Sequence, residues 1–452
     1  MTFYSTEKAA LVLDVGERHI RVGIAGEAHP RVVEKAEFPI GRTGEVLTLR
    51  ESGSGLPGSD AEWEEAVADW LRHVVEDVVG VDASERRLVV GEDLYTPSRF
   101  RNALAAAALS SLNMVSVLFA PSPGMALLPL SLPSALVLDI GGSGALTLPV
   151  VDSMPLHAKA LFSRAGGRLV DANISRLLHL YAKPRDANAR PALLVDLPDE
   201  DDDLGLDDPV WDSILAPTEH RKGTGSVLAH LGGEGEGEGE EEEEGKDALP
   251  AFPPSLVEDF KIKACFVRLG AGDALAPGAA LPPDTEADVH LPVGLESVYD
   301  IKGGVRGMAT EVLFQRGNGA EIVSLQELVL DTLLALPVDL RGLLASNILV
   351  IGGVANTPGL VRRLSWEIDA LLGGKVSGTK YAPLAPLAGR LRFVSSPHKP
   401  DYVAWTGASI VGSMVEYLPQ SSITRDEFLD YGKIYDWSAI GSKEEFAHLF
   451  HM

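Results

Sequence analysis

Two short stretches of this chain end a run of apolar residues with an aspartate and a glycine. Leu11–Gly16 reads Leu-Val-Leu-Asp-Val-Gly, and Leu136–Gly142 reads Leu-Val-Leu-Asp-Ile-Gly-Gly. Each pattern predicts a buried strand, a tight turn and a returning strand. Glycines at such a turn let backbone N–H groups approach an anion, and Asp14 or Asp139 can hold a hydrated cation there. A plain hairpin explains either turn alone, but the repetition predicts two related lobes that face one ligand.

Further residues could complete such a site. Arg21 lies on the strand that returns from the first turn, where it could face either the ligand or solvent. The apolar run Asn347–Ile351 predicts another buried strand, which ends in Gly352 and Gly353. A glycine pair at this edge, followed by a Pro-Gly helix start, could form a floor for a flat ring such as adenine. Close packing of a helix on the strand explains the glycines equally well.

Other segments are predicted from local patterns. Helical spacing predicts a helix at Glu62–Val79 with its Trp and Val residues, Val78 included, in the core, and Thr96 is expected to cap a helix that ends at Leu109. Pro254–Val267 is expected to run from a helix into a strand. Gly41–Asp60 is rich in Gly and Ser and is interpreted as a surface connection.

Composition limits the possible classes of protein. The chain has 452 residues, 45% of them hydrophobic, which is enough for one large two-lobed protein or two to three domains. The single cysteine, Cys265, excludes an internal disulfide and points to the reducing cytosol or nucleus. No apolar run is long enough to span a bilayer. The net charge of −26 argues against nucleic acid or an anionic membrane as the main partner.

These motifs together resemble the actin family, within the superfamily of sugar kinases and Hsp70-like proteins. The resemblance covers nearly the whole chain in order. It is carried by Leu13-Asp14-Val15-Gly16, Asp139-Ile140-Gly141-Gly142, Gly166-Gly167-Arg168, Asp259–Lys263, and Ile351–Gly353 with Pro358-Gly359. It implies an α/β, two-lobed fold with a central nucleotide cleft.

The resemblance also implies how the chain is divided. Residues 1–135 plus 398–452 form the first lobe, with a small subdomain at about 35–60, and residues 136–397 form the second. The region of actin's DNase-binding loop is reduced. Residues 184–254, which include a Gly-Glu alternation and a run of glutamates, are expected to be a disordered acidic insertion within the second lobe.

The resemblance implies that ATP or ADP with Mg²⁺ is bound as a structural ligand. Asp14 and Asp139 would hold the metal through water. The residues implied to bind the cofactor are Asp14, Val15, Gly16, Arg21, Asp139, Gly141, Gly142, Gly167, Lys261, Gly352 and Gly353.

Departures from the actin pattern bear on catalysis. Actin has a histidine seven residues after the second-loop aspartate, and Leu146 stands there in this chain. The glutamine of the preceding helix falls at Gly124 or Ser122, depending on where the gap is placed. Gly142 replaces a second acid, and Ile262 replaces the glutamate that would contact the ribose. Because a water-orienting group must lie within hydrogen-bond reach of the nucleophile, we expect weak or absent hydrolysis and no enzyme activity.

Within the family, the chain is most similar to the divergent actin-related protein of the dynactin pointed-end complex. The local matches are Phe119–Leu128, Val257–Val267 and Gly432–Trp437. This resemblance implies a non-polymerising cap on dynactin's actin-like filament, in the cytoplasm and cytoskeleton. Its partners would be the filament and pointed-end subunits, and it would support dynein-driven transport without inserting into a membrane. The alternatives are a nuclear actin-related subunit of a chromatin-remodelling complex and an ATPase of the superfamily.

Overall fold

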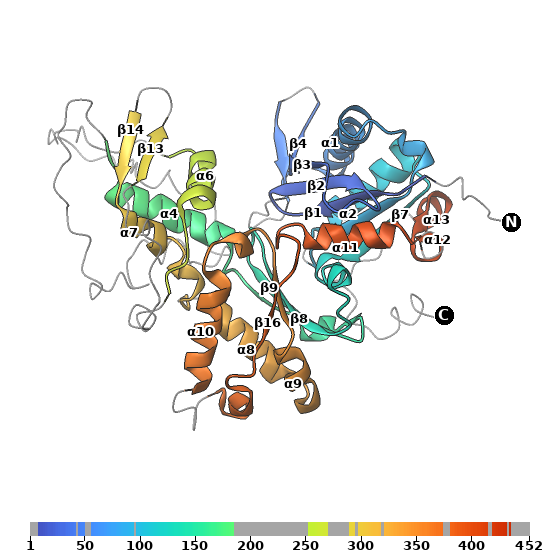
Figure 1. Cartoon of the computed structure of the whole chain (residues 1–452). Helices are drawn as coiled ribbons and strands as arrows, with labels where there is room; N and C mark the ends of the chain where they lie inside the picture. Colours follow the sequence, from blue (N-terminus) through green and yellow to red (C-terminus); the bar gives the residue numbers. More distant parts are fainter. Residues whose placement is uncertain are drawn as a thin grey trace, which may run out of the picture. The chain divides into compact units, whose positions relative to one another are not determined.

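The computed structural model describes the chain in eleven stretches. These are residues 8–41, 44–49, 56–94, 96–184, 252–269, 289–293, 297–317, 321–373, 380–414, 418–431 and 434. The chain divides into two compact units, and each is described by itself (Figure 1). The first unit comprises Met1–Gly166, Gln326–Asn356 and Ile368–Met452, and the second comprises Gly167–Leu325 and Thr357–Glu367. The lobe boundaries expected from the sequence stay a prediction.

A six-stranded sheet in the first unit carries the first turn. Its order is β17-β7-β6-β1-β2-β3. The strands are β1 (Leu11–Val15), β2 (His19–Ile24), β3 (Val32–Lys35), β6 (Leu88–Glu92), β7 (Ser116–Pro121) and β17 (Ile423–Thr424). β1 pairs with β2 as an antiparallel hairpin and with β6 in parallel, so the first turn lies at the carboxyl end of a central strand.

Helices and helical turns pack on this sheet through an aromatic core. They are α1 (Asp60–Arg72), η1 (His73–Val78), η2 (Ala83–Glu85), α2 (Ser98–Ala106) and η3 (Ala107–Ser111). The Phe38 ring packs against the rings of Trp63, Trp70 and Phe100 at centroid distances of 5.3–5.5 Å. A capping box starts α1, because Ser59 accepts from the Glu62 amide and the Glu62 carboxylate accepts from the Ser59 amide.

Three sequence expectations in this region need correction. Val78 is exposed. The helix widens to π geometry at His73, and the changed number of residues per turn moves the last positions of the predicted apolar face out of the core. Pro97, not Thr96, precedes α2, and no side chain caps that helix. The supposed surface connection Gly41–Asp60 contains β5 (Val46–Thr48), which pairs with β4 (Glu37–Pro39) and buries Leu47.

A second sheet in the first unit carries the second turn. Its order is β10-β9-β8-β15-β16, with β11 also paired to β9. The strands are β8 (Ala135–Ile140), β9 (Ala145–Val151), β10 (Met154–Pro155), β11 (Leu161–Ser163), β15 (Ile348–Ile351) and β16 (Phe393–Val394). β15 runs parallel to β8 with Ile351 opposite Asp139, so the glycine pair after β15 comes next to the end of β8.

The remaining helices of the first unit surround these sheets. They are α3 (Ser122–Met125), η4 (Leu128–Leu130), η5 (His157–Lys159), α8 (Leu325–Ala335), α9 (Val338–Ala345), η10 (Val354–Asn356), α10 (Leu360–Gly373), η11 (Ala382–Leu387), α11 (Val403–Gly412), α12 (Leu418–Ser421) and α13 (Arg425–Tyr431). The first residue of α8 and the first part of α10 belong to the second unit. Helix α11 packs closely on α3, and a Cβ at Gly407 would overlap the Met125 carbonyl oxygen. Only glycine fits there.

The second unit contains a smaller sheet with order β12-β14-β13. Its elements are α4 (Gly167–Tyr181), β12 (Lys183–Pro184), α6 (Pro254–Ala264), β13 (Val289–Val293), β14 (Ser297–Ile301), α7 (Gly303–Met308) and η9 (Glu311–Leu313). The expected strand after α6 is absent from residues 265–269. The Val267 amide donates instead to Pro358 and the Phe266 amide to Arg306, so this segment pairs with loops and helix ends.

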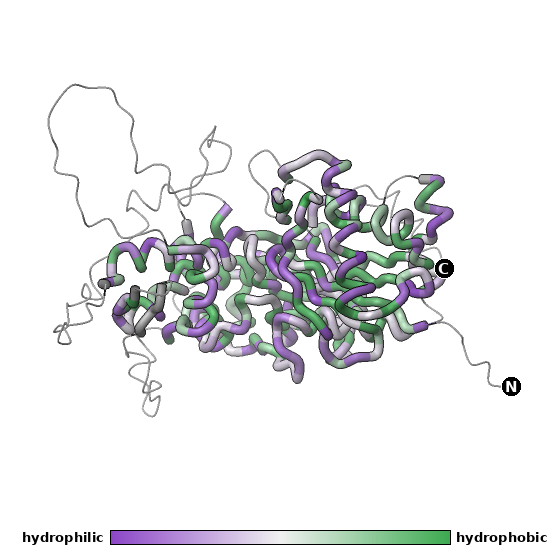
Figure 2. The backbone as a smooth tube through the Cα atoms, turned by 90° about the horizontal axis from the view of Figure 1, so that it is seen from above, coloured by the Kyte–Doolittle hydropathy of each residue, from purple (hydrophilic) through white to green (hydrophobic). Residues whose placement is uncertain are grey.

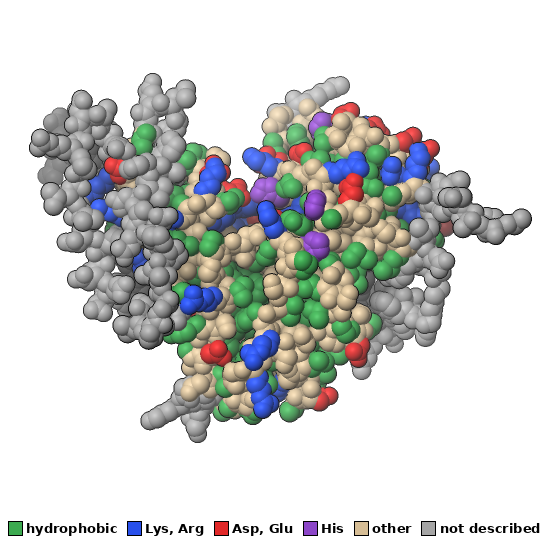
Figure 3. Space-filling view, in the orientation of Figure 1, with side chains coloured by type: hydrophobic (Ala, Val, Ile, Leu, Met, Phe, Trp, Pro, Cys, Tyr) green, Lys and Arg blue, Asp and Glu red, His purple; other side chains and the backbone are tan. Residues whose placement is uncertain are grey.

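In Figure 2 hydrophobic and hydrophilic stretches alternate along the described parts of the backbone. On the face drawn in Figure 3, acidic and basic side chains are interspersed around α1. Within the described stretches, no helix is long and apolar enough to cross a membrane. Nearly all of the expected acidic insertion, and all of Gly432–Trp437 except residue 434, lie outside the described residues.

Candidate functional site

Asp14 lies near the end of β1 and is held by two side chains. Its Oδ1 accepts a hydrogen bond from Ser122 Oγ at 2.9 Å, and its Oδ2 accepts one from Arg21 Nη1 at 3.4 Å. Arg21 Nη2 also lies 3.6 Å from Asp401 Oδ2. Arg21 therefore faces the carboxylates at the turn. Burial raises the pKa of Asp14, although Arg21 and Ser122 act to lower it.

Asp139 lies near the end of β8 beside the glycine pair. A Cβ at Gly352 would lie only 2.5 Å from Asp139 Oδ1, and the φ of Gly352 is +96°, so glycine is required there for both space and backbone conformation. Burial, together with the charges of Asp93 and Asp14, raises the pKa of Asp139 to about 8, and Arg21 opposes this shift. Three carboxyl groups are therefore near enough to interact electrostatically.

The turns themselves are tight. The Gly16 amide donates to the His19 carbonyl at 3.1 Å, and a Cβ at Gly16 would lie 2.9 Å from that oxygen. The Gly141 amide donates to Gly144 at 2.9 Å. Next to it, a Cβ at Gly142 would lie 3.2 Å from Glu17 Oε2, so the side chain after the first turn reaches the second turn.

Leu146, at the position of actin's histidine, and Ser122, one of the two residues at which the glutamine falls, both lie close to the aspartates of the turns. Leu146 is opposite Asp139 in the β8–β9 register and is 2% exposed, so an apolar side chain lies beside the carboxylate. Ser122, and not Gly124, reaches Asp14, because nothing lies within 4 Å of a Cβ at Gly124. The structure thus settles which of the two residues stands next to the first aspartate.

The other expected site residues are distributed as follows. Val15 is buried in β1, and a Cβ at Gly353 would contact nothing within 4 Å. Gly167 begins α4 and Lys261 lies on α6, both in the second unit, where Lys261 Nζ pairs with Asp171 Oδ1 at 2.8 Å. The next residue on α6, Ile262, is 66% exposed.

Sequence reasoning missed three acids at this site: Asp93, Glu17 and Asp401, whose Oδ2 lies 3.6 Å from Arg21 Nη2. Asp93 follows β6, whose carboxyl end lies beside that of β1, and no motif marked it. Glu17 directly follows the glycine of the first turn, outside the Asp-x-Gly pattern that predicts the turn.

The fit of a magnesium nucleotide can be judged from these charges. A hydrated cation suits the arrangement of Asp14, Asp93 and Asp139. Within the described part of the chain, no group of three or more His, Cys, Asp or Glu side chains could hold a metal ion directly. A polyphosphate fits poorly, because Glu17 adds a further acid between the turns. Bound ATP or ADP with Mg²⁺ stays a prediction.

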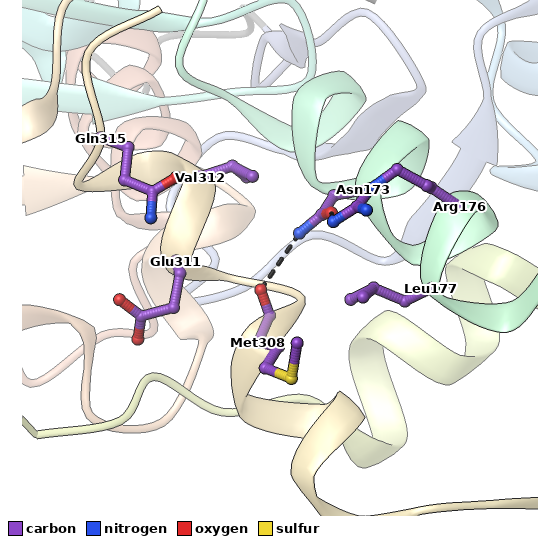
Figure 4. A pocket seen from close by; sticks show the side chains of 7 residues that line it. All are labelled: Asn173, Arg176, Leu177, Met308, Glu311, Val312 and Gln315. Atoms are coloured by element: carbon purple, nitrogen blue, oxygen red, sulfur yellow. Dashed lines mark hydrogen bonds between the residues drawn. The ribbon is translucent and has the colours of Figure 1, made fainter. Parts of the chain in front are cut away.

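The second unit contains a cavity of about 140 Å³ (Figure 4). It is lined by Asn173, Arg176, Leu177, Met308, Glu311, Val312 and Gln315. Asn173 Nδ2 donates to the Met308 and Ala309 carbonyls at 3.0 and 3.1 Å, which ties α4 to the end of α7. Arg363 on α10 contacts both Glu311 carboxylate oxygens at 3.3 Å. These polar groups serve the packing of the unit.

The comparison with protein families decides what this fold is. The family model "Actin" matches residues 58–201 and 251–436. The chain belongs to the actin family. The α/β fold with two main sheets, each carrying one strand–Asp–x–Gly turn, is the actin fold.

Several relatives match this actin-family chain along most of their length. "SWI/SNF and RSC complexes subunit arp42" of Schizosaccharomyces pombe is 23% identical over 90% of this chain and 93% of its own. "Actin-related protein 4" of Yarrowia lipolytica is 23% identical over 95% of both chains. "Actin-related protein 10" of Dictyostelium discoideum is 19% identical over 94% of this chain and 86% of its own. The chain is therefore similar to actin-related proteins in particular.

Proposed function

We propose that this chain is a non-catalytic actin-related subunit of a multiprotein complex of the chromatin-remodelling class, working in the nucleus. The observation that carries the proposal is the nearly end-to-end match to a relative named as a subunit of the SWI/SNF and RSC complexes. The local resemblance of Phe119–Leu128, Val257–Val267 and Gly432–Trp437, taken alone, favours dynactin instead.

The absence of turnover is part of the proposal, and the neighbourhood of Asp139 supports it. An attacking water needs a proton acceptor or an orienting polar group within hydrogen-bond reach. Leu146 offers an apolar side chain opposite Asp139, and the Ser122 hydroxyl already donates to Asp14. Such a protein would serve as a folded surface for other subunits.

The second candidate is a cap on the pointed end of dynactin's actin-like filament. It is favoured by the local resemblance of Phe119–Leu128, which spans the end of β7, α3 and the start of η4. This candidate requires filament and pointed-end subunits as partners and a cytoplasmic location.

One experiment separates the two candidates. The tagged chain is purified from its own cells under native conditions, and the proteins that accompany it in stoichiometric amounts are identified by mass spectrometry. Recovery of remodeller subunits supports the first proposal. Recovery of dynein-adaptor and actin-like filament subunits without remodeller subunits would replace it with the second.

A further inference from the structure

The contact between Glu17 and Gly142 has no role in the function proposed above. A Cβ at Gly142 would lie 3.2 Å from Glu17 Oε2, 3.4 Å from Cδ and 3.6 Å from Oε1. These similar distances mean that the whole carboxyl group faces Gly142. Its Oε2 atom is buried. The side chain that follows the first turn therefore extends to the second turn.

We propose that the Glu17 carboxyl group takes the anion position between the two turns, so that this chain keeps them together without a bound nucleotide. Glycine-rich turns of this kind let the backbone approach an anion closely, which is why the sequence predicts a phosphate ligand between them. A carboxylate that belongs to the turn itself fills that position without the entropic cost of binding a free ligand.

The charged side chains around the two turns also favour a site without a bound nucleotide. Asp93 and Asp14 both act on the Asp139 carboxyl group, Asp401 acts on Asp14, and Arg21 opposes these acids at both aspartates. A phosphate placed beside these acids and Glu17 would meet like charges in a poorly solvated place.

Glycine at position 142 is part of the same arrangement. Any side chain there would begin at a tight contact with Glu17, and the neighbour would have to move. A second acid at position 142 would also place two like charges against each other. Gly142 thus provides the room that the Glu17 carboxyl group uses.

The test is thermal unfolding of the purified chain with ATP and MgCl₂ added at about 1 mM, because a ligand of the folded state raises the midpoint. The variants are Glu17→Gln, which keeps the shape and removes the charge, and Glu17→Ser, which also opens space. Glu37→Gln is the matched control, since Glu37 is an exposed acid of the same unit, 3.9 Å from Lys35. Circular dichroism at the starting temperature establishes that each variant is folded.

For the original chain and for Glu37→Gln, we expect that ATP and MgCl₂ do not shift the midpoint of thermal unfolding. For both Glu17 variants, we expect that they raise it. If Glu17→Ser does not fold, Glu17→Gln alone carries the test. A rise for the original chain that Glu17→Gln abolishes would show that Glu17 helps to hold a metal nucleotide, and the proposal would be wrong. No rise in any folded variant would overturn it as well. Complex membership is measured separately, so this failure would leave the proposed function standing.

Discussion

The Ser122 hydroxyl donates a hydrogen bond of 2.9 Å to the Asp14 carboxylate, joining the start of α3 to the end of β1. Because Asp14 is buried, removing the Ser122 hydroxyl leaves its carboxylate with one hydrogen bond fewer to offset the cost of burial. We expect Ser122→Ala to lower the free energy of unfolding by about 1–3 kcal/mol, measured by urea denaturation. Ser175→Ala is the control, since Ser175 donates only to the Asp171 carbonyl of its own helix, and we expect almost no change. Equal losses for the two variants would contradict the role assigned to Ser122.

The close packing of α11 on α3 gives a second prediction. A Cβ at Gly407 would overlap the Met125 carbonyl oxygen, and backbone cannot move aside cheaply. Gly407→Ala should therefore destabilise the protein by about 1–3 kcal/mol or more. Gly342→Ala on the exposed side of α9 meets nothing within 4 Å and should be neutral or slightly stabilising. Thermal unfolding of the two variants makes the comparison, and a stable Gly407→Ala variant would show that the contact is looser than described.

Glu92 and Arg101 form an ion pair in which both side chains are 1% exposed, at 2.9 Å. Removing one partner leaves a buried charge, so Arg101→Leu should cost about 3–5 kcal/mol. The double variant Glu92→Leu/Arg101→Leu should recover part of that loss, because no buried charge is left over. The exposed pair Lys263–Asp259, at 2.7 Å, is the control, and Lys263→Ala should cost about 0.5 kcal/mol or less. A small effect of Arg101→Leu would mean that Glu92 is solvated or protonated once its partner is gone.

Cys265 provides a probe of the second unit. Burial raises the pKa of its thiol from 9.0 to about 12, so at pH 9 the folded chain holds roughly five-hundredfold less thiolate than a free thiol. We expect iodoacetamide to react slowly with the folded chain up to about pH 10 and rapidly in urea. The reaction is followed by mass spectrometry and is unambiguous, because the chain has one cysteine. Fast alkylation of the folded protein would show that the segment around Cys265 opens readily.

Much of the site could be predicted because its signals are local. The hairpins around Asp14 and Asp139 follow from apolar runs that end in Asp-x-Gly, and both are present as expected. The strand that ends in Gly352 is also predicted by its apolar run, but its place beside Asp139 comes from the parallel pairing of β15 with β8, which no local pattern predicts. The resemblance to the actin family, which the motifs suggested, is confirmed by the family comparison.

The features that could not be predicted depend on contacts between distant residues. Ser122 and Asp14 are 108 positions apart, and only the fold shows that Ser122 is the residue that meets the aspartate. Asp93 belongs to no motif and reaches the site because β6 lies beside β1. The contact of Glu17 with the second turn could not be predicted, because only the fold shows that this turn faces Glu17. The π geometry at His73, which exposes Val78, likewise leaves no clear signal in a spacing of 3.6 residues.

The most direct test of the central claim is the size of the particle that contains this chain in a native cell extract. Size-exclusion chromatography with detection of the chain should place it in an assembly far larger than its own 48.1 kDa, with little free chain, and added ATP and Mg²⁺ should leave the assembly intact. A chain that elutes mainly as a monomer, or that grows into filaments when salt and Mg²⁺ are added, would contradict the account of an actin-related subunit that works within a fixed complex.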